Sequence, residues 1–285
     1  MANALERTGF VPIHDAHAIE QLNTTVIFAR PLSDTEMRQA TESMSAFEAT
    51  LPGFGQIMGM GFSIGPQGVS PMMQNASEAP AGVLRTYTDP KGVVVKELKL
   101  ERQALTFRTL AYTRWSTVWK EARNYFEVVL ARVPNEVMLS GYTLSYSDKF
   151  IWHGVASEMD VNLLLRQDSE YITPKTFSAN DLWHCHSGQF VRAKESVKRL
   201  IVVDCDCVDE QEFGANRRVV RIGTTLTELL NQPGFEQSTI PLPSSMNTLD
   251  EAFRILHNEL KKVFSEIVSD AIAETVGLNG DSNAN

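Results

Sequence analysis

The sequence predicts an α+β protein made of two units, each an antiparallel β-meander with an amphipathic helix packed on a curved sheet. Short runs of β-branched and aromatic residues recur with turn residues between them, which is typical of hairpin-connected strands. Two longer segments carry apolar residues at helical spacing. The chain has 285 residues, 43% of them hydrophobic and 21% charged. This is a globular composition, and at about 150 residues per domain it indicates two domains.

The first expected unit covers residues 25–146, after an N-terminal segment at 1–24, and has the order β-α-β-β-β-α-β. It opens with a strand at 25–29. Ser33 and Glu36 then form a capping box, because the serine oxygen can accept from a free backbone N–H while the glutamate reaches back to the cap residue. An amphipathic helix is expected to follow.

Residues 52–82 are expected to form a long connection with one strand near 60–64. This segment holds seven of the 17 glycines and four of the ten methionines. Glycine is conformationally permissive and proline lacks a backbone donor, so such a composition disfavours long regular elements.

A three-strand meander follows at 83–88, 93–100 and 104–110. The short polar connections between these strands have hairpin chemistry. An aromatic-rich stripe predicts a helix at 115–133, which ends at a proline, and a strand follows at 137–146.

The second expected unit covers residues 181–277 and follows a connecting region at 147–180. A second capping box precedes a long amphipathic helix that begins near residue 249 and ends before Gly277, and residues 278–285 are expected to fray. The strands expected before this helix lie at 182–192, 199–206 and 217–226.

Charge and cysteine content narrow the class of protein. There are 35 acidic and 26 basic residues, for a formal net charge of −9, which disfavours a protein coated in nucleic acid. Three cysteines do not make a disulfide framework, and no apolar run reaches the length of a membrane span. The sequence therefore predicts a cytoplasmic protein.

Familiar catalytic motifs are missing from the sequence. The glycines near residue 55 lack dinucleotide-binding spacing, and no Gly-Lys-Ser/Thr phosphate loop or His-Glu-x-x-His motif occurs. No Gly-x-Ser-x-Gly elbow occurs either. This favours a binding or regulatory protein over an enzyme.

Two segments carry the residue types that bind metals, 183–186 and 204–207. On strands, alternate residues share a face, so His184 and His186 share one face, and Cys205 and Cys207 share a face opposite the neighbouring aspartates. If the strands are neighbours, two imidazoles can meet either two thiolates or two carboxylates. The metal candidates are His184, His186, Cys205 and Cys207, a set suited to structural zinc.

The second ligand set would use Asp204 and Asp206 with the two histidines, and it suits a metal-dependent hydrolase or nuclease. The spacing is not the Cys-x-x-Cys of a zinc ribbon. In the simpler alternative, the cysteines are small core residues and the histidines lie on a half-exposed face without a metal.

A locally basic stretch is the other candidate site. Between residues 85 and 132 there are ten basic and five acidic residues, so this region is +5 in a protein of −9. Basic side chains that share one sheet face can hold phosphates or an acidic partner, although a solvated face is the alternative. The expected anion-facing residues are Arg85, Lys96, Lys99, Arg108 and Arg114.

The order of short motifs resembles a sporadically distributed family of uncharacterised prokaryotic proteins. The residues that carry the resemblance are His17-Ala18-Ile19-Glu20, Phe28-Ala29-Arg30-Pro31-Leu32-Ser33, Tyr112-Thr113-Arg114-Trp115, Pro134-Asn135-Glu136-Val137 and Leu256-His257-Asn258-Glu259. The resemblance spans about residues 12 to 277. The chain departs from it at Gly141-Tyr142-Thr143-Leu144, where the family has a strand close to Arg-Tyr-Ile-Asn. The chain therefore lacks or replaces any site that used this arginine and asparagine.

The resemblance implies no activity, and the patchy distribution of the family suggests accessory loci such as defence or toxin–antitoxin neighbourhoods. The leading hypothesis is a non-enzymatic bacterial protein that binds a protein partner or a small ligand. Formation of homo-oligomers is compatible with this hypothesis. A metal-dependent hydrolase or nuclease that uses His184 and His186 with Asp204 and Asp206 is the alternative. Nucleic-acid binding by the basic sheet face is the weaker one.

Overall fold

The computed structural model describes residues 8–58, 60–65, 68–73, 80–179, 181–194, 197–212, 214–230, 240–241 and 246–278. Helices and antiparallel strands are both present, so the predicted α+β class is confirmed. The chain divides into two compact units. Unit 1 contains Met1–Leu22, Thr143–Leu229 and Glu251–Asn285, and unit 2 contains Asn23–Tyr142 and Leu230–Asp250. Neither unit is continuous in sequence, and both differ in extent from the ranges expected above.

In unit 2, the sheet has the strand order β2-β8-β7-β6-β3. Its elements are β2 (Ile19–Phe28, from residue 23 on), α1 (Asp34–Ser43), the 3₁₀ turn η1 (Met44–Phe47), β3 (Gly53–Ile57), β4 (Met60–Gly65), β5 (Gly68–Met73), β6 (Gly82–Thr88), β7 (Val94–Glu101), β8 (Ala104–Thr109), α2 (Trp115–Leu130), the start of β9 (Met138–His153) and β13 (Ile240–Pro241).

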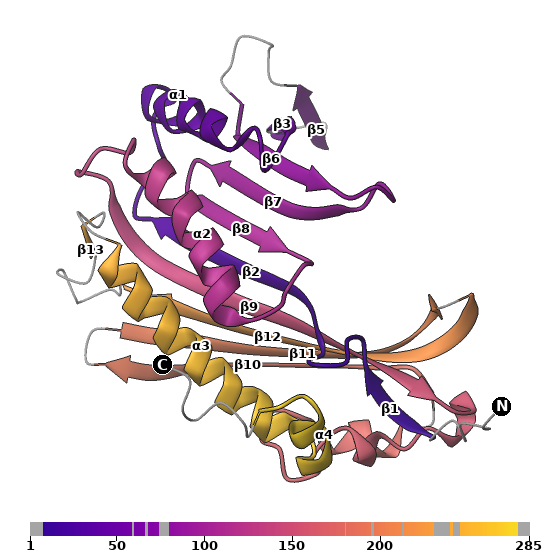
Figure 1. Cartoon of the computed structure of the whole chain (residues 1–285). Helices are drawn as coiled ribbons and strands as arrows, with labels where there is room; N and C mark the ends of the chain where they lie inside the picture. Colours follow the sequence, from indigo (N-terminus) through magenta and orange to yellow (C-terminus); the bar gives the residue numbers. More distant parts are fainter. Residues whose placement is uncertain are drawn as a thin grey trace. The chain divides into compact units, whose positions relative to one another are not determined.

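The helices of unit 2 form where the sequence predicts them. The α1 cap is the expected capping box, with Ser33 accepting from the backbone of Glu36 and Glu36 accepting from the backbone of Ser33. Helix α2 lies against one face of the sheet (Figure 1). There the Tyr125 ring packs 5.2 Å from the Phe107 ring and 4.7 Å from the Phe47 ring. Burial of this aromatic face stabilises the unit.

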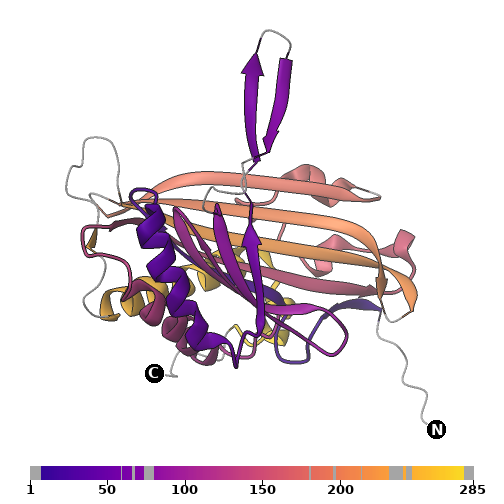
Figure 2. The same cartoon turned by 90° about the horizontal axis from the view of Figure 1, so that it is seen from above.

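The glycine-rich segment contains more strand than expected. Strand β3 pairs with β6, and β4 pairs with β5 as a separate two-stranded sheet (Figure 2). A Cβ on Gly53 would lie 2.2 Å from Thr86 Oγ1, so glycine permits this close strand approach. The long connection predicted for this region is therefore wrong, although one of these strands lies at the expected position.

Unit 1 has the strand order β10-β11-β12-β9. Its elements are β1 (Gly9–Pro12), β9 from residue 143 on, the short turns η2 (Ala156–Glu158), η3 (Val161–Leu163) and η4 (Pro174–Ser178), then β10 (Trp183–Lys194), β11 (Val197–Glu212), β12 (Ala215–Leu229), α3 (Asn247–Ile267) and α4 (Asp270–Thr275). Strand β9 extends seven residues into the expected connecting region. The tail beyond residue 278 lies outside the described residues.

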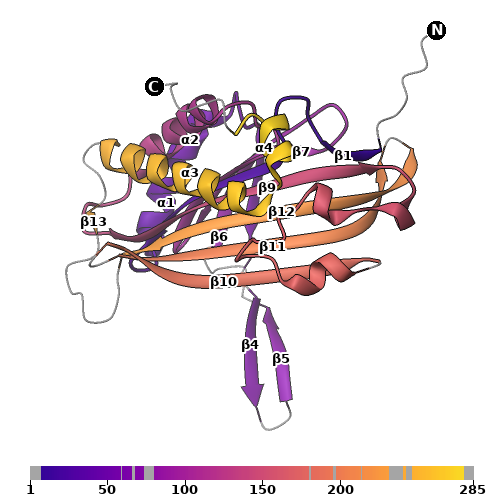
Figure 3. The ribbon, with the colours of Figure 1, turned by 90° about the horizontal axis from the view of Figure 1, so that it is seen from below.

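Helix α3 covers one face of the unit 1 sheet from residue 251 onwards (Figure 3). Its His257 Nδ1 lies 2.9 Å from the Tyr146 hydroxyl, and its Glu259 accepts from Arg199 of β11 at 3.2 Å. The apolar side chains on this covered face are buried, whereas the opposite face is partly exposed and mixes polar side chains with apolar ones such as Val202 and Phe190. Within the described residues, no helix has the length and apolar character needed to cross a membrane.

Candidate functional site

The candidate site lies on the open face of the unit 1 sheet, where β10 pairs antiparallel with β11. Their register places His184 opposite Asp206 and His186 opposite Asp204. Directly opposed residues of an antiparallel pair project from the same face. All four side chains therefore gather on the face that α3 leaves open, and we call these four residues the His–Asp cluster.

Each histidine of the cluster is hydrogen-bonded to its opposed aspartate. His184 Nδ1 lies 2.5 Å from Asp206 Oδ1, and His186 Nδ1 contacts Asp204 Oδ1. The two rings are stacked with centroids 6.5 Å apart. Ligand atoms of His184, His186 and Asp204 lie within 4.8 Å of one another, so small side-chain rotations would let them share one ion.

This arrangement has the hydrogen-bond pattern of many metal sites. When a carboxylate accepts from Nδ1–H of a histidine, it fixes the tautomer and leaves Nε2 free for a metal. His186 Nε2 lies over Gly188, 4.0 Å from the position of an ideal Cβ, so residue 188 itself places no side chain against this nitrogen. The hydrogen bond with Asp206 and its negative charge raise the pKa of His184, so protons compete with a metal there.

The cysteines are not part of this cluster. Cys205 opposes Cys185 in the register, and all three cysteines are buried on the covered face. Burial raises the pKa of the Cys207 thiol to about 11 and that of the Cys205 thiol further, so both stay protonated at neutral pH. The zinc set of His184, His186, Cys205 and Cys207 is therefore wrong, because the sheet places its two halves on opposite faces.

The five basic residues expected to face an anion do not share a surface. Lys96 points toward α2 and pairs with Glu121 at 2.7 Å, whereas Lys99 lies on the opposite face and pairs with Glu101 at 2.8 Å. Alternation along β7 separates these two lysines.

The other three of these basic residues are also dispersed. Arg85 is buried and donates to the Leu51 carbonyl at 3.3 Å. Arg108 lies 3.8 Å from Glu97, and Arg114 is the exposed residue that precedes α2. The predicted basic sheet face is therefore wrong, and nucleic-acid binding by this face has no structural support.

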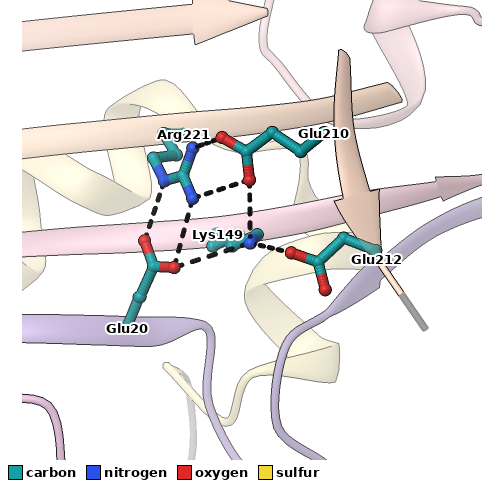
Figure 4. A network of polar contacts seen from close by, with 5 residues as sticks. All are labelled: Glu20, Lys149, Glu210, Glu212 and Arg221. Carbon is teal, nitrogen blue, oxygen red and sulfur yellow. Dashed lines mark hydrogen bonds and ion pairs between the residues drawn. The ribbon is translucent and has the colours of Figure 1, made fainter. Parts of the chain in front are cut away.

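A charged network that the sequence patterns did not predict lies on the open face of unit 1 (Figure 4). Lys149 contacts three glutamates, and Arg221 contacts two of the same three. The adjacent Asp148 points to the covered face, where it is 5% exposed. The adjacent Asp148 and Lys149, which are the carboxylate and the ammonium group within β9, were the available signal. The glutamates are Glu20, Glu210 and Glu212.

A groove in unit 2 lies between α1 with η1 and the end of α2, with a volume of about 870 Å³. Its lining is mostly polar and includes Gln39, Glu42, Ser45, Arg132 and Asn135. The groove does not lie between a helix and its sheet, where an apolar ligand would be enclosed.

Comparison with protein-family models and with curated proteins gives no match. Among solved structures, the chain is similar to the di-domain ARO/CYC StfQ from the steffimycin biosynthetic pathway at 9% identity. That match covers 86% of this chain and 96% of the other, with a TM-score of 0.15. A likeness at this level supports no inference about fold or activity. The fold and site define an α+β protein with an exposed His–Asp cluster, and the resemblance to the sporadically distributed prokaryotic family stays a prediction.

Proposed function

We propose that the protein is a non-enzymatic binding protein of the bacterial cytoplasm whose unit 1 binds a divalent transition-metal ion such as Zn²⁺. The ligands are His184, His186 and Asp204, with the Asp204 carboxylate exchanging its hydrogen bond with His186 for the ion, and Asp206 orients His184. The observation that supports this proposal is the convergence of ligand atoms from these three residues within 4.8 Å.

The donor types suit such an ion. Two imidazoles and one carboxylate are a common zinc set, and hard ions such as Mg²⁺ or Ca²⁺ prefer oxygen ligands alone. The imidazoles are held on one strand, so little conformational entropy is lost when the ion binds.

Exposure of the cluster favours binding over catalysis. The four side chains are 43–60% exposed. Hydrolytic metal sites gain much of their rate from a water-excluded cleft, where electrostatic stabilisation of the transition state is strong. An ion on an open sheet face lacks this environment.

A metal-dependent hydrolase is the second candidate, because the three-ligand set leaves a position for an activated water. Its residues would be His184 and His186 with Asp204 and Asp206. A turnover assay with metal-loaded protein and phosphodiester and ester substrates separates the candidates. Hydrolysis that is lost in His186→Ala would favour the enzyme and contradict the non-enzymatic proposal.

Calorimetric titration of the chelator-stripped protein with Zn²⁺ tests metal binding. We expect one equivalent to bind at pH 7.5, and His186→Ala to lower the affinity at least tenfold because one of three ligands is lost. The affinity should also fall as the pH drops below the raised pKa of His184, because bound imidazole must be neutral.

Two matched variants complete this test. Asp206→Asn should weaken binding by about 10-fold or more, the effect of removing an outer-shell carboxylate. Cys207→Ala should leave the affinity unchanged, because this thiol lies on the other face of the sheet. Unchanged affinity in His186→Ala, or loss of binding in Cys207→Ala, would contradict the proposed ligand set.

A further inference from the structure

Strand β10 is the outermost strand of the unit 1 sheet. Within the part of the chain that the structure describes, it pairs with β11 from Trp183 to Lys194 and with no other strand. The segment around Tyr171 contacts its covered face, where the Tyr171 carbonyl lies 3.9 Å from Cys185 Sγ, and no backbone hydrogen bond among the described residues joins this segment to the outer edge. The backbone groups along that edge can therefore pair with another strand.

The exposed side chains of β10 also indicate a partner. Phe190 is 63% exposed and lies on the same face as His184 and His186. A large aromatic side chain on an open strand edge is costly to leave in water and is typical of contact surfaces.

We infer that a second copy of this chain binds here, through antiparallel pairing of the two β10 strands around a two-fold axis at Gly188. In this register His186 opposes the partner's Phe190, and His184 opposes the partner's Arg192. Alternate residues share a face, so all of these side chains project from the open face of the joined sheet.

Opposite charges near the two ends of β10 favour a second copy of this chain over an unrelated peptide. The exposed Arg192 lies near one end of β10, and the acidic partners of the histidines, Asp204 and Asp206, lie beside the other end. Antiparallel pairing sets each Arg192 opposite the partner's His184 and two strands, roughly 10 Å, from the partner's acidic pair. At this separation the opposite charges still attract, and both such approaches form at once in an isologous two-fold interface. Gly188 at the axis adds no side chain between the strands.

This inference does not rest on the metal site. The pairing groups lie in the plane of the sheet, whereas the His–Asp cluster projects from its face. All association measurements would therefore be made with chelator present, so that metal-bridged association is excluded and failure of one proposal leaves the other intact.

Sedimentation equilibrium of the full chain between about 1 and 100 µM tests the association. We expect a reversible dimer. Arg192→Ala should weaken it at least tenfold, because the attraction to the partner's acidic pair is lost at both ends of the interface, and Arg192→Lys should retain it. Far-UV circular dichroism would verify that both variants fold. A monomer throughout this range, or larger open assemblies, would overturn the inference.

Cysteine cross-linking tests the register. Gly188→Cys should form a covalent dimer on mild oxidation, because opposed Cα atoms lie roughly 4.5–5.5 Å apart, within disulfide reach. The site has room for the side chain, since the atoms nearest an ideal Cβ are 3.9–4.0 Å away.

Arg192→Cys is the matched control for this experiment. Its two copies would lie eight residues apart along the strands, roughly 26 Å, and should not cross-link. The wild-type cysteines are buried and should not cross-link either. Cross-linking of Arg192→Cys without that of Gly188→Cys would overturn the register and the proposed interface with it.

Discussion

Replacing Lys149 with methionine is expected to lower the free energy of unfolding by about 2–4 kcal/mol, as measured by urea denaturation at pH 7.5. The Lys149 side chain is 4% exposed and lies 3.5 Å from Glu20 and 3.1 Å from Glu210, with Glu212 also in contact. Without the ammonium group, Glu20 and Glu210 would keep Arg221 as their cation, whereas Glu212 would lose the cation that it contacts. Breaking a fully buried ion pair typically lowers the free energy of unfolding by about 3–5 kcal/mol. A somewhat smaller loss is expected here because the glutamates are partly exposed.

The pH dependence of this loss follows from Glu210. Its hydrogen bond with Arg221 outweighs burial and lowers its pKa to about 2. Because the folded-state pKa is below the unfolded one, the stabilisation is present above about pH 4.5 and is lost as the pH falls toward 2. The difference between wild type and Lys149→Met should shrink over that interval.

Lys198→Met is the matched control for this prediction, because Lys198 lies exposed on β11. It should change the free energy of unfolding by less than about 0.5 kcal/mol. Equal stability of Lys149→Met and wild type at pH 7.5 would show that the network is merely a surface arrangement.

Asp148→Asn is expected to make the protein more stable at alkaline pH, by at least about 1 kcal/mol at pH 8.5. Asp148 is buried on the face of β9 that carries Tyr146, and burial raises its pKa to about 8. Ionising this carboxyl in the folded protein is therefore costly. An amide of the same shape avoids that cost, although its own burial reduces the gain.

Asp148 stabilises the folded protein at acidic pH and loses this effect as the pH rises. The folded-state pKa of Asp148 lies above the unfolded value of about 3.9, so the folded state holds the proton over the interval between them. Stability from this group is fully present below about pH 4 and is lost by up to about 1.4 kcal/mol per pH unit as the pH rises toward 8.

Thermal unfolding of wild type and Asp148→Asn between pH 4.5 and 8.5 measures this effect. The two curves should diverge as the pH rises, with the variant more stable at the upper end. Asp15→Asn, an exposed site in the turn after β1, should run parallel to wild type. Parallel curves for Asp148→Asn would mean that this carboxyl is ionised in the folded protein at no cost.

Local patterns were enough to predict the main elements. The capping box at Ser33 and the apolar stripes of α2 and α3 predict these helices. Apolar residues at helical spacing can be recognised within one segment of the sequence, without knowledge of the elements that the helix packs against. The strands at 83–110 were predicted from turn chemistry for the same reason. The signals failed at β3 and β5, where glycine-rich sequences are held as strands by neighbours rather than by propensity.

The site could be predicted only in part. Alternation along strands showed from the sequence that His184 and His186 share a face, and that the cysteines at 205 and 207 lie opposite the aspartates at 204 and 206. That left two ligand sets, one with thiolates and one with carboxylates.

The sequence by itself determined which residues of each strand share a face, because side-chain alternation is a property of a single strand. Only the tertiary structure decided which faces meet. Burial under α3 and the segment before β10 holds Cys185 and Cys205 inside, and this fixes the register that sets His184 against Asp206 and His186 against Asp204. A slip of one residue would have exchanged the carboxylates for thiolates.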